Sequence, residues 1–297
     1  MGGISVETVT MSNKTKTSQE NLHRHLREVM ERHKLPSLPI VVTKVLNMLN
    51  DPDFSVRQLS RVISDDTALA SRTLAISRSA RYAQRHQPTT VHEAILVLGY
   101  QTLRNIVMAT AAQSFLTRKN KTAEKLWSHS LAAALAARIL SQRVGLKDSE
   151  LAFLAGLLHD VGEMILLHGD PKGFEQLVSE LQQTKEPIVE KEKELYSFDH
   201  SSIGVALLDF WNIDSRIGEA VLCHHDQEDS PDPKSLITIL SMVDYLCFKA
   251  DLAFSEPPAP APQVISAFGC EDEASLEELV QEVRQAFDEE SVLFKPA

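Results

Sequence analysis

The sequence contains few of the residues on which common cofactor and disulfide sites depend. Only three of its 297 residues are cysteines, Cys223, Cys247 and Cys270, and no two of them show CxxC spacing. An odd, scattered set of this kind argues against a disulfide framework and against a zinc site built from thiolates. Eleven glycines are present, but none forms a GxGxxG, Walker A or GxSxG pattern, so nucleotide-cofactor and serine-hydrolase chemistry has no support.

Positive charge and long apolar runs are also scarce. Thirty Lys and Arg residues stand against 41 Asp and Glu residues, which gives a net charge of −11. Broad attraction to nucleic acid or to an anionic membrane requires clustered positive charge, so we expect neither as a partner. No apolar run approaches the roughly 20 residues that span a bilayer, and no export or lipidation signal is recognisable. We therefore expect a cytoplasmic protein.

What the sequence does contain is helical periodicity. Apolar residues recur every three or four positions through most of the chain, which predicts an all-α fold, a multi-helix bundle of two helical subdomains. Residues 169–203 give the weakest signal. The expected organisation is a flexible N-terminal tail over residues 1–20, a helical subdomain over 21–118, a second helical subdomain over 119–252, and a Pro/Ala linker with a C-terminal helix over 253–297. We expect residues 21–297 to form one compact unit.

Local signals predict where several helices begin. Ser55 starts a capping-box pattern, Asp65 or Asp66 can cap the helix that follows, and Ser275 starts a second capping box before the last helix. That last helix carries an apolar stripe. We expect the stripe to pack on the body of the protein, with a dimer contact as the alternative.

The segment "LAGLLHDVGEMILL" places a histidine and an aspartate next to each other within an apolar run that reads as one helix. A buried carboxylate is costly, so a chain keeps one only where a cation or a hydrogen-bond network receives it. Six of the eleven histidines lie between residues 129 and 225, beside apolar helical runs. With two acids they form a candidate site: His129, His159, Asp160, His200, His224, His225 and Asp244. A lone histidine of this kind is more often a hydrogen-bonded core residue, but seven such groups on five expected helices favour a metal site.

These positions resemble the HD superfamily of metal-dependent phosphohydrolases. The matching segments are "WSHS" with His129, "LLHDVG" with His159 and Asp160, and "SMVDYL" with Asp244. Two further segments resemble the HD-GYP branch, whose sites hold two metal ions: "DHSSIG" with His200 and "LCHHD" with His224 and His225.

The resemblance implies two ions that share one carboxylate. The first would be held by His129, His159, Asp160 and Asp244, and the second by His200, His224, His225 and Asp160. A bridging carboxylate can hold two ions about 3.5 to 4 Å apart, and such a pair activates water and clamps a phosphoryl group. Asp160 and His159 are therefore the expected catalytic residues. Imidazole and carboxylate ligands suit a divalent transition metal, iron or manganese first, with nickel or zinc as alternatives.

The first half brings a second resemblance. The segments "LPSLPIVVTKVLNMLNDPDFS" and "EAILVLG" look like the HDOD family, an HD-related output domain of bacterial signalling proteins, over about residues 30–250. HDOD members commonly lack some HD ligands and are taken to be regulatory scaffolds, whereas this chain keeps the ligands. Glu163 stands where HD-GYP phosphodiesterases have a lysine, and no GYP motif follows His225. We interpret Glu163 as a candidate extra ligand, with a solvated helix residue as the alternative.

Three functions follow from these resemblances. The first is a bacterial signal-transduction protein with a metal-binding HD-type site, whose partner is a signalling protein or a phosphorylated small molecule. The second is an active metal-dependent phosphodiesterase or phosphohydrolase acting on a nucleotide or cyclic dinucleotide. The third is a metal-free scaffold for protein interactions. A helix–turn–helix over residues 55–77 is also conceivable, with four nearby arginines at positions 72, 78, 81 and 85, but the net charge favours simple helix packing.

Overall fold

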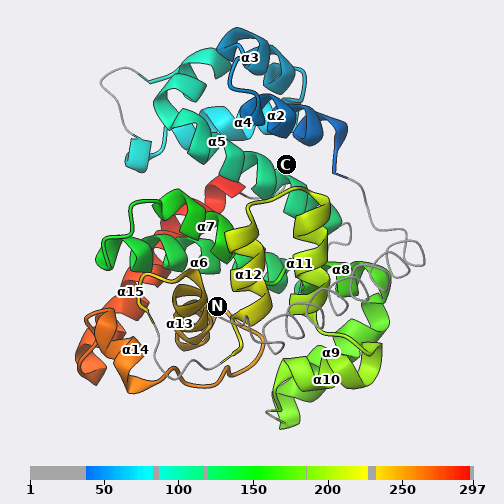
Figure 1. Ribbon diagram of the computed structural model, residues 1–297, viewed down its shortest axis with the longest axis vertical. Coiled ribbons are helices and arrows are strands. Elements are labelled where there is room, and N and C mark those ends of the chain that lie inside the picture. Colours follow the sequence, from blue (N-terminus) through cyan, green and yellow to red (C-terminus); the bar gives the residue numbers. More distant parts are fainter. Residues whose placement is uncertain (1–37, 83–86, 117–119, 185, 227–231, 295–297) are drawn as a thin grey trace, which may run out of the picture.

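The computed structural model describes residues 38–82, 87–116, 120–184, 186–226 and 232–294, which fold into helices joined by short connections (Figure 1). No strand occurs among these residues, so the expected all-α class is confirmed. The expected tail over residues 1–20 lies outside the described residues. The α-helices are α2 (Ile40–Asn50), α3 (Val56–Ser64), α4 (Thr67–Ser77), α5 (Val91–Phe115), α6 (Lys121–Arg143), α7 (Ser149–Leu158), α8 (Val161–Gly169), α9 (Pro171–Thr184), α10 (Ile188–Tyr196), α11 (His200–Phe210), α12 (Ser215–Cys223), α13 (Leu236–Lys249), α14 (Pro262–Ala267) and α15 (Glu273–Glu290).

The first helices, α2 to α5, gather at one end of the molecule (Figure 1). Asp66 caps α4 by accepting a hydrogen bond from the backbone N–H of Leu69, as its position predicts. Ser55 occupies the cap position of α3, but its side chain makes no capping hydrogen bond, so the expected capping box there is wrong. The helix α5 bends at Gly99, whose φ of 74° is readily adopted only by glycine.

A buried arginine joins α4 to α5 and to the C-terminal end of the described chain. Arg72 lies on α4 with 9% of its surface exposed and donates hydrogen bonds to Thr110 and Gln113 of α5. Gln113 in turn donates to the carbonyl oxygen of Phe294 near the C-terminus. The guanidinium is thus used inside the protein, in agreement with the packing interpretation of this helix pair.

The long helix α6 runs through the middle of the molecule, and its alanine-rich middle turns are buried between neighbours. It packs closely against α7 because Gly156 has no side chain; a Cβ there would overlap the carbonyl of Ala133. One apolar cluster extends from Val42 in α2 through α6 and α7 to Phe294. The two predicted subdomains therefore share a core.

The stretch that we expected to be one helix, residues 149–167, is two helices. The helix α7 ends at Leu158 and α8 begins at Val161, so the His159–Asp160 pair forms the joint between them. Asp160 adopts φ −103° and ψ 22°, close to the sparsely populated bridge region where many functional residues sit. Residues 149–169 are the one described stretch long and apolar enough to cross a membrane, and 89% of its apolar window is buried inside the protein.

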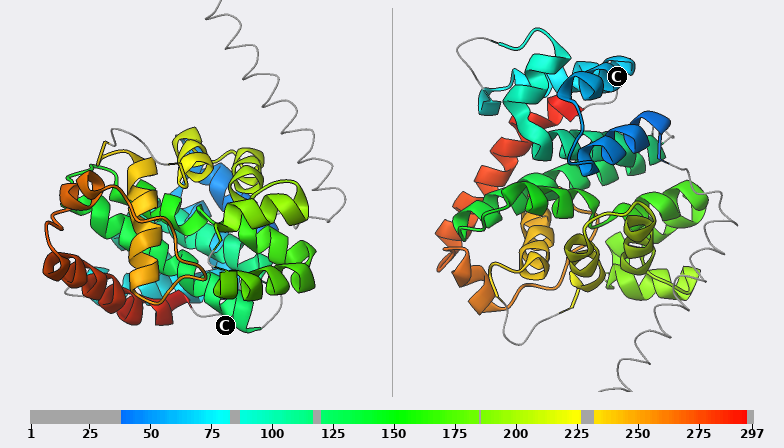
Figure 2. Two further views of the ribbon diagram at one scale, coloured as in Figure 1. Left: turned by 90° about the horizontal axis from the view of Figure 1, so that it is seen from below. Right: turned by 45° about the horizontal axis from the view of Figure 1, so that its top comes forward.

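After α13 the chain runs without regular structure over residues 253–261, here called the strap, and then continues into α14 and α15. Figure 2 shows α15 lying along one flank and returning toward the N-terminal helices. Its side chains Leu279, Val280 and Val283 are buried, so the expectation that the stripe packs on the body is confirmed. The helix begins at Glu273 with Asp272 as its cap, and the predicted start at Ser275 is wrong.

Candidate metal centre

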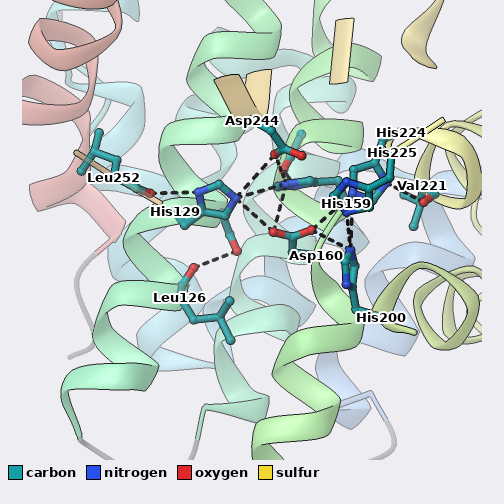
Figure 3. A network of polar contacts seen from close by, with 12 residues as sticks. Leu126, His129, His159, Asp160, His200, Val221, His224, His225, Asp244 and Leu252 are labelled. Carbon is teal, nitrogen blue, oxygen red and sulfur yellow. Dashed lines mark hydrogen bonds and ion pairs between the residues drawn. The ribbon is translucent and has the colours of Figure 1, made fainter. Parts of the chain in front are cut away.

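The seven predicted site residues converge on one point between α6, α7, α8, α11, α12 and α13. Figure 3 shows the carboxylate of Asp160 at the centre, with one group of side chains on each side. The first group contains His129, His159, Asp160 and Asp244, and the second contains His200, His224 and His225. Within each group the potential ligand atoms lie within 4.8 Å of one another. The grouping is the one that the family resemblance implies.

Two of the histidines are held by the same local device. His159 directly follows α7 and His224 directly follows α12, and each ring Nδ1 donates back to a carbonyl three residues earlier, that of Gly156 at 2.8 Å and that of Val221 at 2.7 Å. These carbonyls belong to the last turn of a helix, where acceptors lack an intrahelical partner. The hydrogen bond fixes the proton on Nδ1, so each Nε2 presents a lone pair to the site.

His129 and His200 are oriented in the same way by other acceptors. The Nδ1 of His129 donates to the carbonyl oxygen of Leu252 at 2.9 Å, just before the strap. The Nδ1 of His200 donates to the Glu192 carboxylate at 2.7 Å, and the backbone N–H of His200 donates to the same oxygen at 2.9 Å. A metal-binding histidine usually has its second ring nitrogen engaged by a carbonyl or carboxylate in this manner.

The side chain of Asp160 lies at the centre of the site and does not cap its own helix. It stands at the N-cap of α8, where an aspartate usually accepts a hydrogen bond from the first turn, but its side chain makes none. Its Oδ2 lies 3.0 Å from His129 Nε2 and 3.1 Å from His159 Nε2. Its Oδ1 lies 3.5 Å from His200 Nε2 and 3.6 Å from His224 Nε2. One carboxylate therefore faces both groups, one oxygen to each.

The remaining two site residues complete the groups. Asp244 on α13 places Oδ1 3.0 Å from His159 Nε2 and 3.8 Å from His129 Nε2. His225 places Nε2 2.9 Å from His200 Nε2. The two aspartates are almost wholly buried, and His225 is half-buried beside a cavity.

Burial and charge shift the ionisation of these groups strongly. Burial lowers the pKa of His159, but the charges of Asp160 and Asp244 outweigh it and raise the pKa to about 10. Burial raises the pKa of Asp160, yet the charge of His159 and hydrogen bonds from neighbouring histidines hold it well below its usual range. Burial, together with His224 and His200, lowers the pKa of His225 to about 2. With protons as the only cations, the first group is thus an ion pair and His225 is neutral.

The residues fit a metal centre. Four imidazole Nε2 lone pairs and two carboxylates point inward, and His129 Nε2 lies only 3.2 Å from His159 Nε2 although both Nδ1 atoms carry the proton. Two facing lone pairs repel unless a cation, either a proton or a metal ion, lies with them. Nitrogen and oxygen donors of this kind suit divalent iron, manganese, nickel or zinc.

A glycine lets the second group approach the first. Gly162, two residues after Asp160, packs against the backbone of α11, and a Cβ there would overlap the carbonyl oxygen of His200 and the side chain of Ile203. The nearest of these atoms is the backbone carbonyl of His200, which cannot rotate away as a side chain can. The "HDVG" sequence therefore supplies both the ligands and the space that His200 requires.

Two buried glutamates flank the centre, and sequence reasoning found only one of them. Glu163 on α8 is 3% exposed, so the alternative of a solvated helix residue is wrong. Burial and the charge of Asp160 raise its pKa well above the usual range. Glu192 on α10 is fully buried and orients His200, but it lies in a strongly charged segment within the stretch of weakest sequence signal. Its only sequence signal is a spacing of four residues from the apolar Ile188.

A cavity of about 390 Å³ opens onto the centre. His129, Asp160, His200, His225 and Asp244 line it, together with apolar residues of α10 and the strap. A second cavity of about 250 Å³ is lined by His224, His225 and Asp244, and it shares Pro257 and Pro258 of the strap with the first. The strap therefore contributes to the wall of both cavities.

Comparison with known proteins identifies the family. The HDOD domain model matches residues 35–227. A crystal structure of an HDOD domain protein of unknown function from Geobacter sulfurreducens is 26% identical, with a TM-score of 0.71, and the match covers 91% of this chain and 98% of that one. A candidate phosphohydrolase from Shewanella amazonensis SB2B is 24% identical, with a TM-score of 0.67 and coverage of 90% and 96%, which supports the fold.

A curated relative is considerably longer than this chain. An uncharacterised protein of Treponema pallidum is 23% identical over 264 residues, which are 86% of this chain and 50% of the relative. The chain thus spans about half the length of that relative. Asp244 and the strap lie beyond the residues that the family model matches, so the first group of ligands is completed by a part of the fold outside it.

Proposed function

The chain belongs to the HDOD family, and from this premise we propose that it is a bacterial signal-transduction protein whose HD-type site binds divalent metal and a phosphorylated ligand. One ion would be held by the first group of ligands and a second by the other group, with Asp160 shared between them. Iron and manganese are the favoured ions. The observation that carries the proposal is the orientation of four buried imidazoles toward the two oxygens of one carboxylate.

The hydrogen bonds that orient these imidazoles favour a metal site over a cluster of histidines that only hydrogen bond to one another. A histidine that only satisfies its neighbours needs no fixed tautomer, but here His129, His159 and His224 each donate Nδ1–H to a backbone carbonyl. The free Nε2 atoms gather around Asp160, whose own capping role is unfilled. Each of these arrangements costs free energy that a bound cation would offset.

The roles of the chain's residues follow from their contacts. Bound metal would supply positive charge at the cavity floor and act as a Lewis acid toward a phosphoryl oxygen. Asp160 would hold both ions in register, and Glu192 would keep His200 in the ligating tautomer. The apolar wall formed by Ile188, Phe254 and Pro257 would face the non-phosphate part of the ligand. A volume of about 390 Å³ suits one small molecule.

The cavity also explains why the proposal favours binding over turnover. Its described lining contains six carboxylates, those of Asp160, Glu163, Glu190, Asp226, Asp244 and Glu256, and a single ammonium group, that of Lys193. Lys193 is partly neutralised by Asp199, 3.3 Å away. Few groups other than metal could stabilise a phosphoryl transition state in such surroundings, whereas a regulatory ligand needs only to bind.

Elemental analysis of the purified chain tests the proposal. The wild type, expressed in medium supplemented with iron and manganese, should contain transition metal, and His159→Ala should lose most of it. His168→Ala is the matched control, because His168 lies on α8 outside the site and hydrogen bonds only to the Phe115 carbonyl among the described residues. A wild type without metal, or equal metal in wild type and His159→Ala, would refute the proposal.

A metal-dependent phosphohydrolase or phosphodiesterase is the second candidate, favoured by the access of one cavity to both ligand groups. Turnover of nucleotides, cyclic dinucleotides or generic phosphodiesters with manganese or iron(II), with oxygen excluded, would establish it. If the metal site carries this turnover, His159→Ala should lose it. No turnover by metal-loaded protein across the panel would leave the binding function alone.

A further inference from the structure

Beside the two ligand groups lies a third cluster of buried acids. Glu163 is one turn after Asp160 on α8, and Glu192 is on α10; they are 3% and 0% exposed. With His200 they form a set whose potential ligand atoms lie within 4.8 Å of one another. Neither glutamate belongs to the two groups described above.

Each glutamate has an oxygen with no partner among the described residues. Glu192 uses Oε2 for the backbone N–H and the ring Nδ1–H of His200, which leaves Oε1 buried and unpaired. Glu163 Oε2 is also buried and unpaired. Buried carboxylate oxygens are normally paired, because an unpaired buried charge costs several kcal/mol. One potential ligand atom of each glutamate lies within 4.8 Å of the other and of His200, so a cation or a shared proton between the two carboxylates would satisfy both.

We propose that Glu163 and Glu192 hold a further divalent cation, separate from the ions of the two imidazole-rich groups. The ion would bind the two unpaired oxygens, while Glu192 Oε2 continues to accept from His200. Glu163 also lines the 390 Å³ cavity, so water or a phosphate oxygen can reach the ion from there.

The ligand chemistry selects a hard cation. Two carboxylates supplemented by water are the usual surroundings of Mg²⁺, which keeps several waters and binds few protein ligands, and Mn²⁺ accepts the same oxygens. The imidazole-rich groups prefer softer transition metals. The two kinds of site should therefore be distinguishable by metal preference as well as by position.

The consequence is a change in the charge of the cavity wall. Without a cation, Glu163 and Glu192 offer phosphate no positive charge. With an ion at Glu163 and Glu192, the same place carries net positive character and faces the cavity. A phosphorylated ligand would then meet cations at two places in the cavity.

Equilibrium titration of the full chain with Mn²⁺, following the free ion by electron paramagnetic resonance, tests the inference. Wild type should bind one more equivalent than Glu163→Gln, or bind its weakest equivalent at least about tenfold more tightly, because even outer-shell changes cost about 10- to 100-fold in metal affinity. Glu190→Gln is the control: it removes an exposed carboxylate from the same cavity lining, on the helix that carries Glu192, and should bind as wild type does.

The outcomes separate this inference from the proposed function. Equal stoichiometry and affinity of Mn²⁺ binding in wild type and Glu163→Gln would overturn the glutamate site and show that a proton satisfies the pair. This includes the case in which both proteins saturate at two equivalents of Mn²⁺. A single equivalent lost in Glu163→Gln but kept in His159→Ala would leave this site standing and refute the imidazole-rich centre. A wild type that binds no Mn²⁺ would overturn the glutamate site, and elemental analysis would then decide the other.

Discussion

Removal of divalent metal should lower the thermal midpoint of the wild-type chain, by an amount that the binding free energy sets. Protein in metal at 100 times its dissociation constant gains about 2.7 kcal/mol in free energy of unfolding. For domains of about 150 to 250 residues, each kcal/mol moves the midpoint by about 2 to 4 °C. Excess chelator should therefore lower the midpoint by about 5 to 10 °C, toward the smaller value in a chain of 297 residues.

The structure also predicts how this difference depends on pH. In metal-free protein the pKa of His159 is raised to about 10, above its ordinary 6.5, by Asp160 and Asp244. Its protonated form therefore stabilises the metal-free protein fully below about pH 6.5, and that contribution is lost as the pH rises through about 10. Metal must displace this proton, so its apparent affinity rises about tenfold, or 1.4 kcal/mol, for each pH unit in this window. The effect of chelator should grow from pH 6.5 toward pH 9.

Thermal unfolding followed by circular dichroism, with and without chelator at several pH values, measures both effects. The variant His159→Ala should respond less to chelator than wild type does, and without the pH dependence assigned to His159, whereas His168→Ala should respond as wild type does. A metal-loaded wild type whose midpoint does not move on chelation would refute the reasoning and favour the metal-free scaffold. A difference that shrinks with rising pH would refute the assignment of the displaced proton to His159.

Three further substitutions test local arguments. Gly162→Ala should cost about 1 to 3 kcal/mol in urea unfolding and weaken metal binding, because the new Cβ meets the His200 carbonyl; wild-type metal affinity would contradict this. Asp66→Ala should cost about 1 kcal/mol and Ser55→Ala less than about 0.5, since only the first side chain makes a capping hydrogen bond, and equal losses in urea titrations would contradict the cap assignment. Asp251→Ala should lower the free energy of unfolding by about 1 kcal/mol, because Asp251 has φ 60°, which aspartate adopts more readily than alanine; unchanged stability in urea titrations would contradict this.

The sequence predicted which segments are helical more accurately than it predicted where one helix ends and the next begins. Apolar periodicity identified residues 149–167 as helical, but both α7 and α8 are buried on nearly all sides, so the pattern shows no change at the joint. The break depends on Asp160, which looks like an ordinary N-cap residue but turns its side chain into the site. Helix α10 lies in the stretch of weakest signal, because its charged residues outnumber its buried ones.

The ligand set was predictable by residue type and order, but its orientation was not. His159 and His224 are held by backbone carbonyls of their own helices, and His129 by the carbonyl of Leu252, 123 residues away. Backbone acceptors leave no mark in the sequence, because any residue can supply one. Glu192 is a side-chain acceptor, yet its neighbours in "EKEKELY" hide it among exposed charges.

The charge of the cavity links its two proposed ligands. Lys193 is the single lysine or arginine in the described lining, and Asp199 already pairs with it, so phosphate alone meets a wall rich in carboxylates. Metal at the candidate sites reverses that charge, and phosphate in turn would relieve repulsion among the cations. Such coupling is reciprocal: the factor by which metal tightens phosphate binding must equal the factor by which phosphate tightens metal binding. A site built in this way responds only when both ligands are present, which suits a regulatory protein whether or not it also turns over a substrate.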